Sequence, residues 1–199
     1  MTERAPWTPR PVPVPRRQLA RPYNDAELAS LWGDARAQPT AKRKRAAIAM
    51  LLLGRGAGLD GRWVSKVRAR DVERRDGFVM VRVDEPSART VVVRAEFEAP
   101  LVELTEEARD EFLVGGNSTS RNRTGHLVSQ LVVPTAHPAL APARLRSTWL
   151  VSHLHSGTRL PELCQAAGVK GTGLFGELLE FVSAMSADEA RTMLRQGPP

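Results

Sequence analysis

The sequence contains one cysteine and one tyrosine among its 199 residues, and both scarcities limit its chemistry. Because a disulfide needs two thiols, Cys164 alone excludes an intramolecular disulfide and any all-cysteine metal site. We expect Cys164 to be a small core residue in a protein of the reducing cytoplasm. The one tyrosine, Tyr23, precedes the first expected helix, and we expect it to anchor that helix.

Long apolar runs and histidines are also scarce. The longest apolar run, Ala46–Leu53, is far too short to cross a bilayer, and the N-terminus has no apolar signal-peptide segment. His126 and His137 lie in loop-like sequence without a cysteine or carboxylate at ligand spacing, and His153 and His155 face different sides of one expected helix. We therefore expect a cytoplasmic protein with no membrane association, no metal and no cofactor.

Charge of one sign dominates the composition. There are 29 lysines and arginines against 22 acidic residues, a formal net charge of +7. Basic side chains neutralise phosphates and release condensed counterions, so this excess favours a polyanionic partner. A coding bias that enriches arginine gives the same composition, so a basic surface without a partner is the alternative.

Residues 1–22 differ from the rest of the chain. They are dense in proline and arginine without helical or strand periodicity, which predicts an extended arm. Such an arm either lies along a phosphate backbone or is an inert linker. We expect one folded domain over residues 23–199.

The first half of this domain predicts helices followed by a hairpin. Asn24 and Glu27 have capping-box spacing, and a largely apolar helix follows Thr40. The stretch "GLDGRWVSKVRARDV" predicts a short helix with Trp63, Val64 and Val67 inward. "GFVMVRV" and "RTVVVRAEF", separated by "DEPSA", alternate as two strands of a β-hairpin.

The second half predicts further helices. Thr105 is expected to cap a helix in "TEEARDEFLV", and "GGNSTSRNRTG" is expected to be a flexible polar loop. Helices are predicted over 143–156 and 160–167, in "LFGELLEFVSAM", and in "SADEARTMLRQ", where Ser186 and Glu189 have capping-box spacing. The fold class is therefore mainly α with a small antiparallel β-hairpin or sheet.

Three segments resemble motifs of the tyrosine recombinase (phage integrase) catalytic domain. "GAGLDGRWVSKVRARDV" is similar to a turn and helix that end in Arg-x-x-Asp-hydrophobic, matched by Arg68, Asp71 and Val72. In "RTVVV", Arg89 matches an arginine that opens a strand. "ARLRSTWLVSHLHSGTRLPELCQAAGV" is similar to a His-x-x-Arg helix, a glycine turn and a Leu-Gly-His helix. The resemblance covers roughly residues 22–182 and implies the recombinase catalytic-domain fold.

The resemblance also implies a chemistry that can be sought residue by residue. In the family a tyrosine attacks a DNA phosphodiester, two arginines hold the phosphate oxygens, and a lysine in the hairpin protonates the leaving oxygen. Here Asp60 stands at the first arginine, and Arg62 substitutes for it only if the turn is rebuilt. The two histidine positions hold Ala143 and Val169, while Arg146 fits the second arginine. "DEPSA" contains no lysine, and "GTGLFGELLEFV" contains no tyrosine.

Because only one of six catalytic positions is kept, we expect a non-cleaving pseudoenzyme that binds DNA, in an accessory or regulatory role. No catalytic residue is assigned. The candidate DNA-binding residues are basic side chains of the expected site, the "AKRKR" helix start and the polar loop: Arg146, Arg62, Arg89, Lys66, Arg68, Arg70, Lys42, Arg43, Lys44, Arg45, Arg121 and Arg123. Arg146 either binds a phosphate or pairs with Asp60 or Asp71. The basic helix start either docks a phosphate or is a solvated face.

Three alternatives remain open at this point. The C-terminal helix could make the chain an interaction module or homo-oligomer, since family members often pass this helix to a neighbouring protomer. An active recombinase completed in trans by another chain's tyrosine is a second alternative. The third is a helix-turn-helix in "RLPELCQAAGVKGTGLFGELL", although its second helix is apolar and acidic and suits a major groove poorly.

Overall fold

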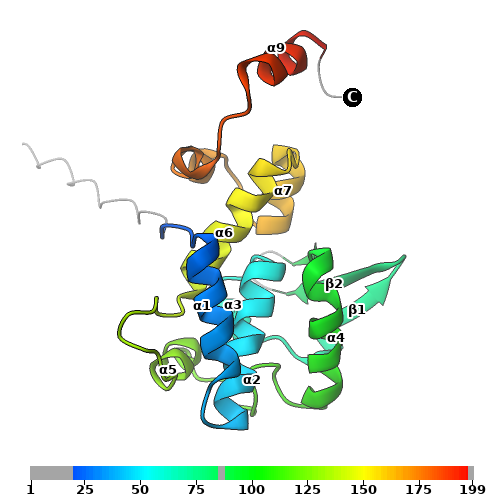
Figure 1. Ribbon diagram of the computed structural model, residues 1–199. Coiled ribbons are helices and arrows are strands. Elements are labelled where there is room, and N and C mark those ends of the chain that lie inside the picture. Colours follow the sequence, from blue (N-terminus) through cyan, green and yellow to red (C-terminus); the bar gives the residue numbers. More distant parts are fainter. Residues whose placement is uncertain (1–19, 85–87, 197–199) are drawn as a thin grey trace, which may run out of the picture.

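The computed structural model describes residues 20–84 and 88–196 (Figure 1). The elements, in chain order, are α1 (Asp25–Arg36), α2 (Ala41–Leu51), the π-helical turn η1 (Leu52–Gly56), α3 (Gly61–Val64), the 3-10 turn η2 (Ala69–Asp71), β1 (Val72–Arg75), β2 (Phe78–Val83), β3 (Arg89–Val92), α4 (Ala95–Ala108), α5 (Arg123–Ser129), α6 (Pro142–His155), α7 (Leu160–Ala167), α8 (Gly173–Gly176), the 3-10 turn η3 (Leu179–Phe181) and α9 (Ala187–Gln196). The predicted mainly α fold with a small antiparallel sheet is confirmed. The N-terminal arm and the centre of "DEPSA" lie outside the described residues.

The first two helices form as predicted. The Asn24 side chain accepts from the Glu27 N–H, and the Glu27 carboxylate accepts from the Asn24 N–H, which completes the capping box. Thr40 caps α2, whose second half is buried and continues into η1. These apolar residues form the centre of the core.

Two glycines let α6 pack tightly against η1 and the turn that follows it. A Cβ added to Gly54 would lie 2.9 Å from Leu145. A Cβ added to Gly58, whose φ is +62°, would lie 2.3 Å from the indole of Trp149. Only residues without a Cβ fit at these positions, so the close contact with α6 depends on glycine.

The sheet has three strands rather than the two that were predicted. β1, β2 and β3 pair in that order, all antiparallel, and Arg75 pairs with Phe78 across a two-residue turn. Both turn residues, Asp76 and Gly77, have positive φ, as the tight hairpin turn requires. The helix predicted through "RWVSKVRARDV" is correspondingly wrong after its first turn, because α3 ends at Val64 and β1 begins at Val72.

Two other predicted boundaries are wrong. α4 runs unbroken through Thr105, so Thr105 is not a helix cap, and the predicted strand "RTVVVRAEF" ends before α4 begins. The buried Phe97, Leu101, Leu104 and Ala108 have helical spacing, and this continuous apolar face explains the longer helix. The predicted helix in "LFGELLEFVSAM" divides into the short turns α8 and η3.

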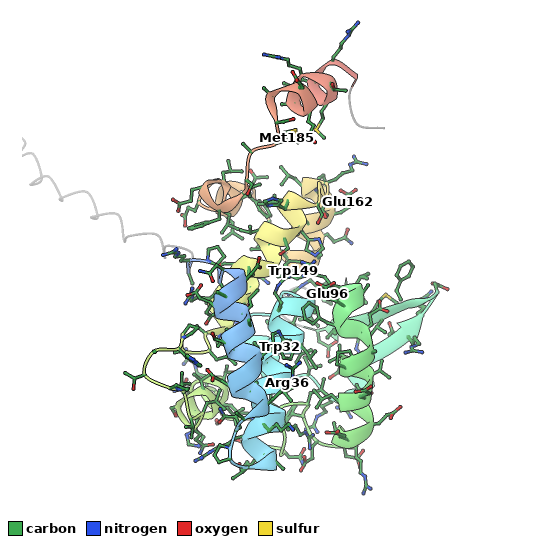
Figure 2. All side chains as sticks on the ribbon, viewed as in Figure 1. Trp32, Arg36, Glu96, Trp149, Glu162 and Met185 are labelled. Carbon is green, nitrogen blue, oxygen red and sulfur yellow. The ribbon has the colours of Figure 1, made fainter. Side chains whose placement is uncertain are left out.

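The last helices differ in how they pack. α6 and α7 lie where they were predicted, and Gly168 ends α7 in the left-handed conformation. α9 begins with the predicted Ser186 and Glu189 capping box. Figure 2 shows Met185 on the segment that leads away from the body to α9, and every α9 residue from 187 to 195 except Ala190 is exposed.

Candidate nucleic-acid interface

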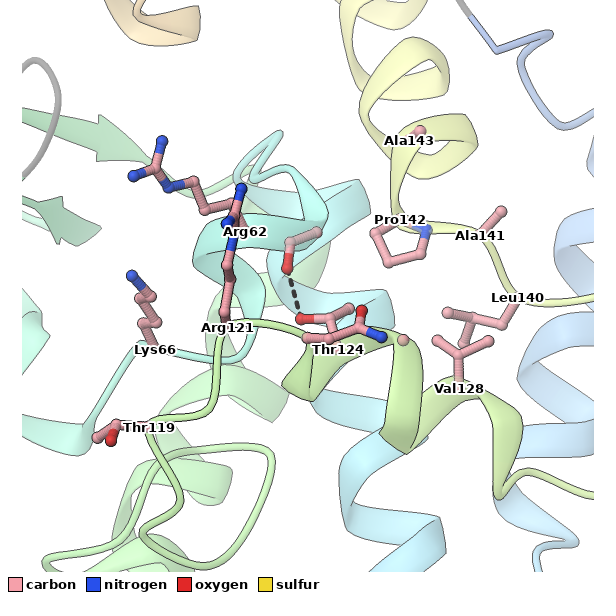
Figure 3. Close-up of a pocket in the computed structure, with 13 residues that line it drawn as sticks. Arg62, Lys66, Thr119, Arg121, Thr124, Val128, Leu140, Ala141, Pro142 and Ala143 are labelled. Carbon is pink, nitrogen blue, oxygen red and sulfur yellow. Dashed lines mark hydrogen bonds between the residues drawn. The ribbon is translucent and has the colours of Figure 1, made fainter.

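A cavity of about 890 Å³ lies between α3, α5 and the start of α6 (Figure 3). Arg62, Lys66 and Arg121 line one side of it, and Pro142 and Ala143 of α6 line the other. All three cations are exposed, and within residues 20–84 and 88–196 none of them forms an ion pair with a carboxylate. We call Arg62, Lys66 and Arg121 the cation triad. Its charges remain available to an anion.

The helix start on the far side of the cavity adds to this positive potential. Proline opens α6 at its first position, and the N-cap Ala141 supplies no side-chain cap. The positive end of the helix dipole therefore faces the cavity beside Ala143, where the resemblance expects a histidine. Thr124 lies between the two sides and donates a hydrogen bond to the Gly61 carbonyl.

Asp60, at the family's first arginine, has a clear structural role. Its carboxylate accepts from the N–H groups of Arg62, at 2.9 Å, and Trp63, at 3.3 Å, and so caps α3. This cap places Arg62 and Trp63 on the first turn of the helix. An acidic residue directly before a helix is a cap signal that the sequence offered and that residue matching to the family overlooked.

Arg146 and Arg89, two of the arginines that match family positions, bind the protein itself. Arg146 donates to the Gly58 carbonyl at 2.5 Å and the Ala167 carbonyl at 2.6 Å, and it forms no ion pair with Asp60 or Asp71, which was one of the two alternatives. The Arg89 Nε–H donates to the Ala166 carbonyl at 3.0 Å. Burial lowers the pKa of both guanidiniums, and the negative charge of Asp60 partly opposes that shift. Both arginines hold the C-terminal end of α7.

A second cavity, of about 440 Å³, adjoins the first through Lys66 and Thr119, which line both. Its cations are Lys66, Arg68, Arg70 and Arg82. Arg68 donates to Asn117 Oδ1 at 3.0 Å. Arg82 was missed because the strand pattern alone gave no reason to place it beside Arg70. A basic surface therefore continues beyond the cation triad.

Two arginines that were predicted to bind DNA form several hydrogen bonds within the protein. Arg123 opens α5 and is not in a flexible loop; it is buried and donates to the carbonyls of Gly115, Gly116 and Ser118. Arg45 donates to the carbonyls of Leu113 and Phe112 and pairs with Glu111. These hydrogen bonds stabilise the loop after α4 and occupy both guanidiniums.

The rest of the basic helix start does not join the cation triad. Lys42 and Lys44 line other cavities, together with Glu107. Arg43 is partly exposed at the first turn of α2 and contributes its N–H to the Thr40 cap. The basic start of α2 and the cation triad therefore lie at different places in the structure.

Tyr23 lies where it was expected. It is buried, its hydroxyl donates to the Ala139 carbonyl at 2.6 Å and accepts from the Ala141 N–H at 2.8 Å, and Arg144 stacks on its ring at 3.7 Å. Burial raises the pKa of its hydroxyl. The interpretation of Tyr23 as an anchor is confirmed.

Metal-binding clusters and membrane-spanning helices are both absent from the described residues. No group of three or more His, Cys, Asp or Glu side chains there is arranged to hold a metal ion. No helix in the same residues has the length and apolarity that a membrane span requires.

Solved structures share this fold. The XerH site-specific recombinase, in a post-cleavage complex with palindromic difH substrate, superposes with a TM-score of 0.61 at 13% identity. The match covers 89% of this chain and 54% of XerH. XerA recombinase gives 0.60 at 14% identity, over 94% of this chain and 67% of its own. The Tn1549 transposon integrase, in complex with circular intermediate DNA, gives a TM-score of 0.55 at 14% identity, and the match covers 87% of this chain and 64% of the integrase.

The chain therefore has the fold of the tyrosine recombinase catalytic domain, as the three sequence segments predicted. It spans about half to two thirds of the length of these recombinases. No protein-family model matches the sequence. No curated protein matches it either.

Proposed function

We propose that this chain is a non-cleaving DNA-binding protein that holds the DNA backbone through the cation triad, in an accessory or regulatory role. The observation that carries the proposal is the contrast between two sets of basic residues. Arg146 and Arg89 donate to protein carbonyls, whereas Arg62, Lys66 and Arg121 are exposed around one cavity without a carboxylate partner among the described residues.

The contacts of such a surface are with phosphates. Lysine and arginine neutralise phosphate charge irrespective of base sequence, so binding is backbone-dominated and weakens steeply with salt. The neighbouring structures support this assignment, because XerH and the Tn1549 integrase were both solved with DNA. Arg70 and the start of α6 extend the same positive surface on either side of the triad.

The absence of cleavage is supported by the lack of a tyrosine where the family has its nucleophile. The sequence has no tyrosine after Tyr23, whose hydroxyl is buried between Ala139 and Ala141. Without a nucleophile no covalent protein–DNA intermediate forms, so a major chemical route is closed.

The test uses a labelled duplex that carries a single nick. The protein should bind it at low salt and leave no covalent adduct after denaturation. Neutralising the triad with Arg62→Gln, Lys66→Gln and Arg121→Gln should weaken binding at least tenfold at low salt. The matched control, Lys42→Gln, Arg43→Gln and Lys44→Gln, removes the same charge elsewhere. A denaturant-resistant adduct, or equal losses in both variants, would contradict the proposal.

A second candidate function, an interaction module, is favoured by α9. Met193 and Leu194 are 52% and 87% exposed on this amphipathic helix, which lies apart from the body (Figure 1). Exposed apolar side chains of this kind mark surfaces that another chain covers. If α9 joins two copies, Met193→Gln with Leu194→Gln should convert a dimer into a monomer in analytical ultracentrifugation. A wild-type monomer at every concentration would rule out self-association through α9.

A further inference from the structure

Trp63 lies at the junction of the two basic cavities. It is partly buried on α3, packs against the core and lines the second cavity. The Lys66 ammonium is 4.9 Å from the indole centroid, and the Arg62 guanidinium is 5.7 Å from it. Two exposed members of the cation triad therefore lie over one aromatic ring.

The second cavity provides room beside this ring. Its volume of about 440 Å³ lies in the range of small-molecule pockets, roughly 300–1,000 Å³. The Ser118, Thr119 and Ser120 loop lines it with hydroxyl-bearing residues. It therefore offers an aromatic wall, cations and hydrogen-bonding groups together.

The two carboxylates of this cavity are already paired. Asp71 accepts from Arg82 at 3.1 Å and from the Arg68 N–H at 2.9 Å, and Asp84 lies 3.4 Å from Arg82. Their negative charge is therefore balanced locally. Lys66 and Arg70 remain as cations of the same cavity that no carboxylate of the described residues pairs.

Phe112, the other aromatic residue of the cavity, is not available for stacking. Its ring is buried, whereas Trp63 is only partly buried. The guanidiniums of Arg68 and Arg123 lie closer over the Phe112 ring, with their Cζ atoms 3.8 Å and 4.6 Å from the centroid. Trp63 is thus the aromatic side chain on which a ligand can stack in this cavity.

An aromatic ring flanked by cations is the arrangement that holds single-stranded nucleic acid. Each unpaired base stacks on the ring, while the cations hold the phosphates on either side. A base inside a duplex cannot reach such a ring without being extruded, which costs a few kcal/mol. Because Lys66 and Thr119 line both cavities, a base in the second cavity leaves its neighbouring phosphate close to the first.

We infer that the second cavity accepts an unpaired DNA nucleotide whose base stacks on Trp63 and whose phosphate contacts Lys66 and Arg62. This inference rests on the proposed DNA binding and adds a substrate preference to it. The protein then holds single-stranded or locally unpaired DNA more tightly than a duplex of the same charge.

The experiment compares a labelled oligo-dT strand with a labelled duplex for four proteins: wild type, Trp63→Leu, Trp63→Phe and Trp32→Leu. Trp32 is the matched control, because it is also a partly buried tryptophan with a cation, Arg36, over its ring at 5.6 Å, but lies outside both cavities (Figure 2). Melting temperatures confirm that each variant is folded.

We expect Trp63→Leu to lose about tenfold in affinity for oligo-dT and far less for the duplex. Trp63→Phe should keep most of the affinity, while the quenching of tryptophan emission by bound oligo-dT is reduced, because Trp7, Trp32 and Trp149 still emit. Trp32→Leu should change neither affinity by more than about twofold. A structural role for Trp63 moves the melting temperature but does not separate the two DNA forms.

Two results distinguish a failure of the stacking inference from a failure of the proposed DNA binding. If Trp63→Leu lowers both affinities equally, or neither, the inference is wrong while backbone binding stands. If wild type binds neither DNA at low salt, the proposed function itself is wrong. Quenching in folded Trp63→Phe that is as strong as in wild type also overturns the stacking assignment.

Discussion

Arg146 in α6 donates a hydrogen bond to the carbonyl oxygen of Ala167 at 2.6 Å, so the arginine that fits the second arginine of the family's motif holds the end of α7. Its second hydrogen bond reaches Gly58, in the turn that Trp149 covers. Arg146 therefore links three segments that are distant in sequence. Its side chain therefore stabilises the packing of α6, α7 and the turn that leads to α3.

The first prediction concerns this link. Arg146→Gln should lower the free energy of unfolding by about 3 kcal/mol, because two buried carbonyls lose a charged donor. Arg62→Gln, an exposed control, should change it by less than about 0.5 kcal/mol. Urea unfolding measures both. Equal stabilities for the two variants would contradict the structural role of Arg146.

The second prediction separates the two roles of Asp60. Asp60→Asn keeps a side-chain oxygen for the helix cap but removes the negative charge that favours the charged forms of Arg89 and Arg146, so stability should fall, though less than in Asp60→Ala. Duplex affinity should rise at low salt, because a carboxylate beside Arg62 no longer repels phosphate. Asp60→Ala should show the same gain in affinity with a loss of about 1 kcal/mol in stability. A fall in affinity for Asp60→Asn would show that the carboxylate assists binding.

The third prediction contrasts Arg121 with Arg123, which lie two residues apart. Arg123→Gln should destabilise the protein by about 2 kcal/mol or more, because several loop carbonyls lose their donor. Arg121→Gln should leave thermal stability unchanged and reduce duplex affinity. Thermal denaturation and fluorescence anisotropy test the pair. The reverse pattern would restore Arg123 as a DNA contact.

The fourth prediction is a pH dependence from His153. Burial, reinforced by the positive charges of Arg94 and Arg55 and opposed by Glu96, lowers the pKa of His153 in the folded protein. Below the unfolded pKa of about 6.5, the unfolded chain takes up a proton that the folded chain excludes. Stability should therefore be greatest above that pH and fall as the solution is acidified.

The variant His153→Gln tests this assignment. It should make the loss of stability below about pH 6.5 less steep, whereas the exposed control His155→Gln should follow wild type. Denaturant unfolding across a pH series gives the comparison. Identical slopes for wild type and His153→Gln would rule out His153 as the source.

The fifth prediction concerns Tyr23. Tyr23→Phe should lower stability by about 1 kcal/mol, because the hydroxyl links Ala139 and Ala141 just before α6. DNA affinity of the folded variant should match wild type. If wild type forms a covalent adduct with nicked DNA and Tyr23→Phe does not, Tyr23 is a nucleophile and the structural assignment fails.

Local signals allowed much of this fold to be predicted from sequence. The capping boxes at Asn24 and Ser186, and the glycine that ends α7, are fixed by residues within one or two turns. The third strand also had a local signal, the Asp76–Gly77 turn between alternating residues, which was overlooked. α4 was divided wrongly because a threonine followed by acids imitates a helix start.

The site was less predictable, because it depends on contacts between distant segments. Arg121 and Arg123 share the same polar sequence, yet only Arg123 meets the carbonyls of the loop after α4. Likewise, Arg146 matches a catalytic position, but its partners Gly58 and Ala167 come from other elements. Burial and nearby backbone carbonyls decide which arginines remain exposed to a phosphate. The sequence pattern contains neither.

The most direct test of DNA binding through the cation triad is the slope of log affinity against log salt for a short duplex. Wild type should show a steep linear fall, and the variant with Arg62, Lys66 and Arg121 all changed to Gln should be less steep by about 0.9 for each phosphate that it no longer neutralises. The variant with Lys42, Arg43 and Lys44 changed to Gln should keep the wild-type slope. A flat wild-type slope, or the same slope in all three proteins, would contradict DNA binding through the triad.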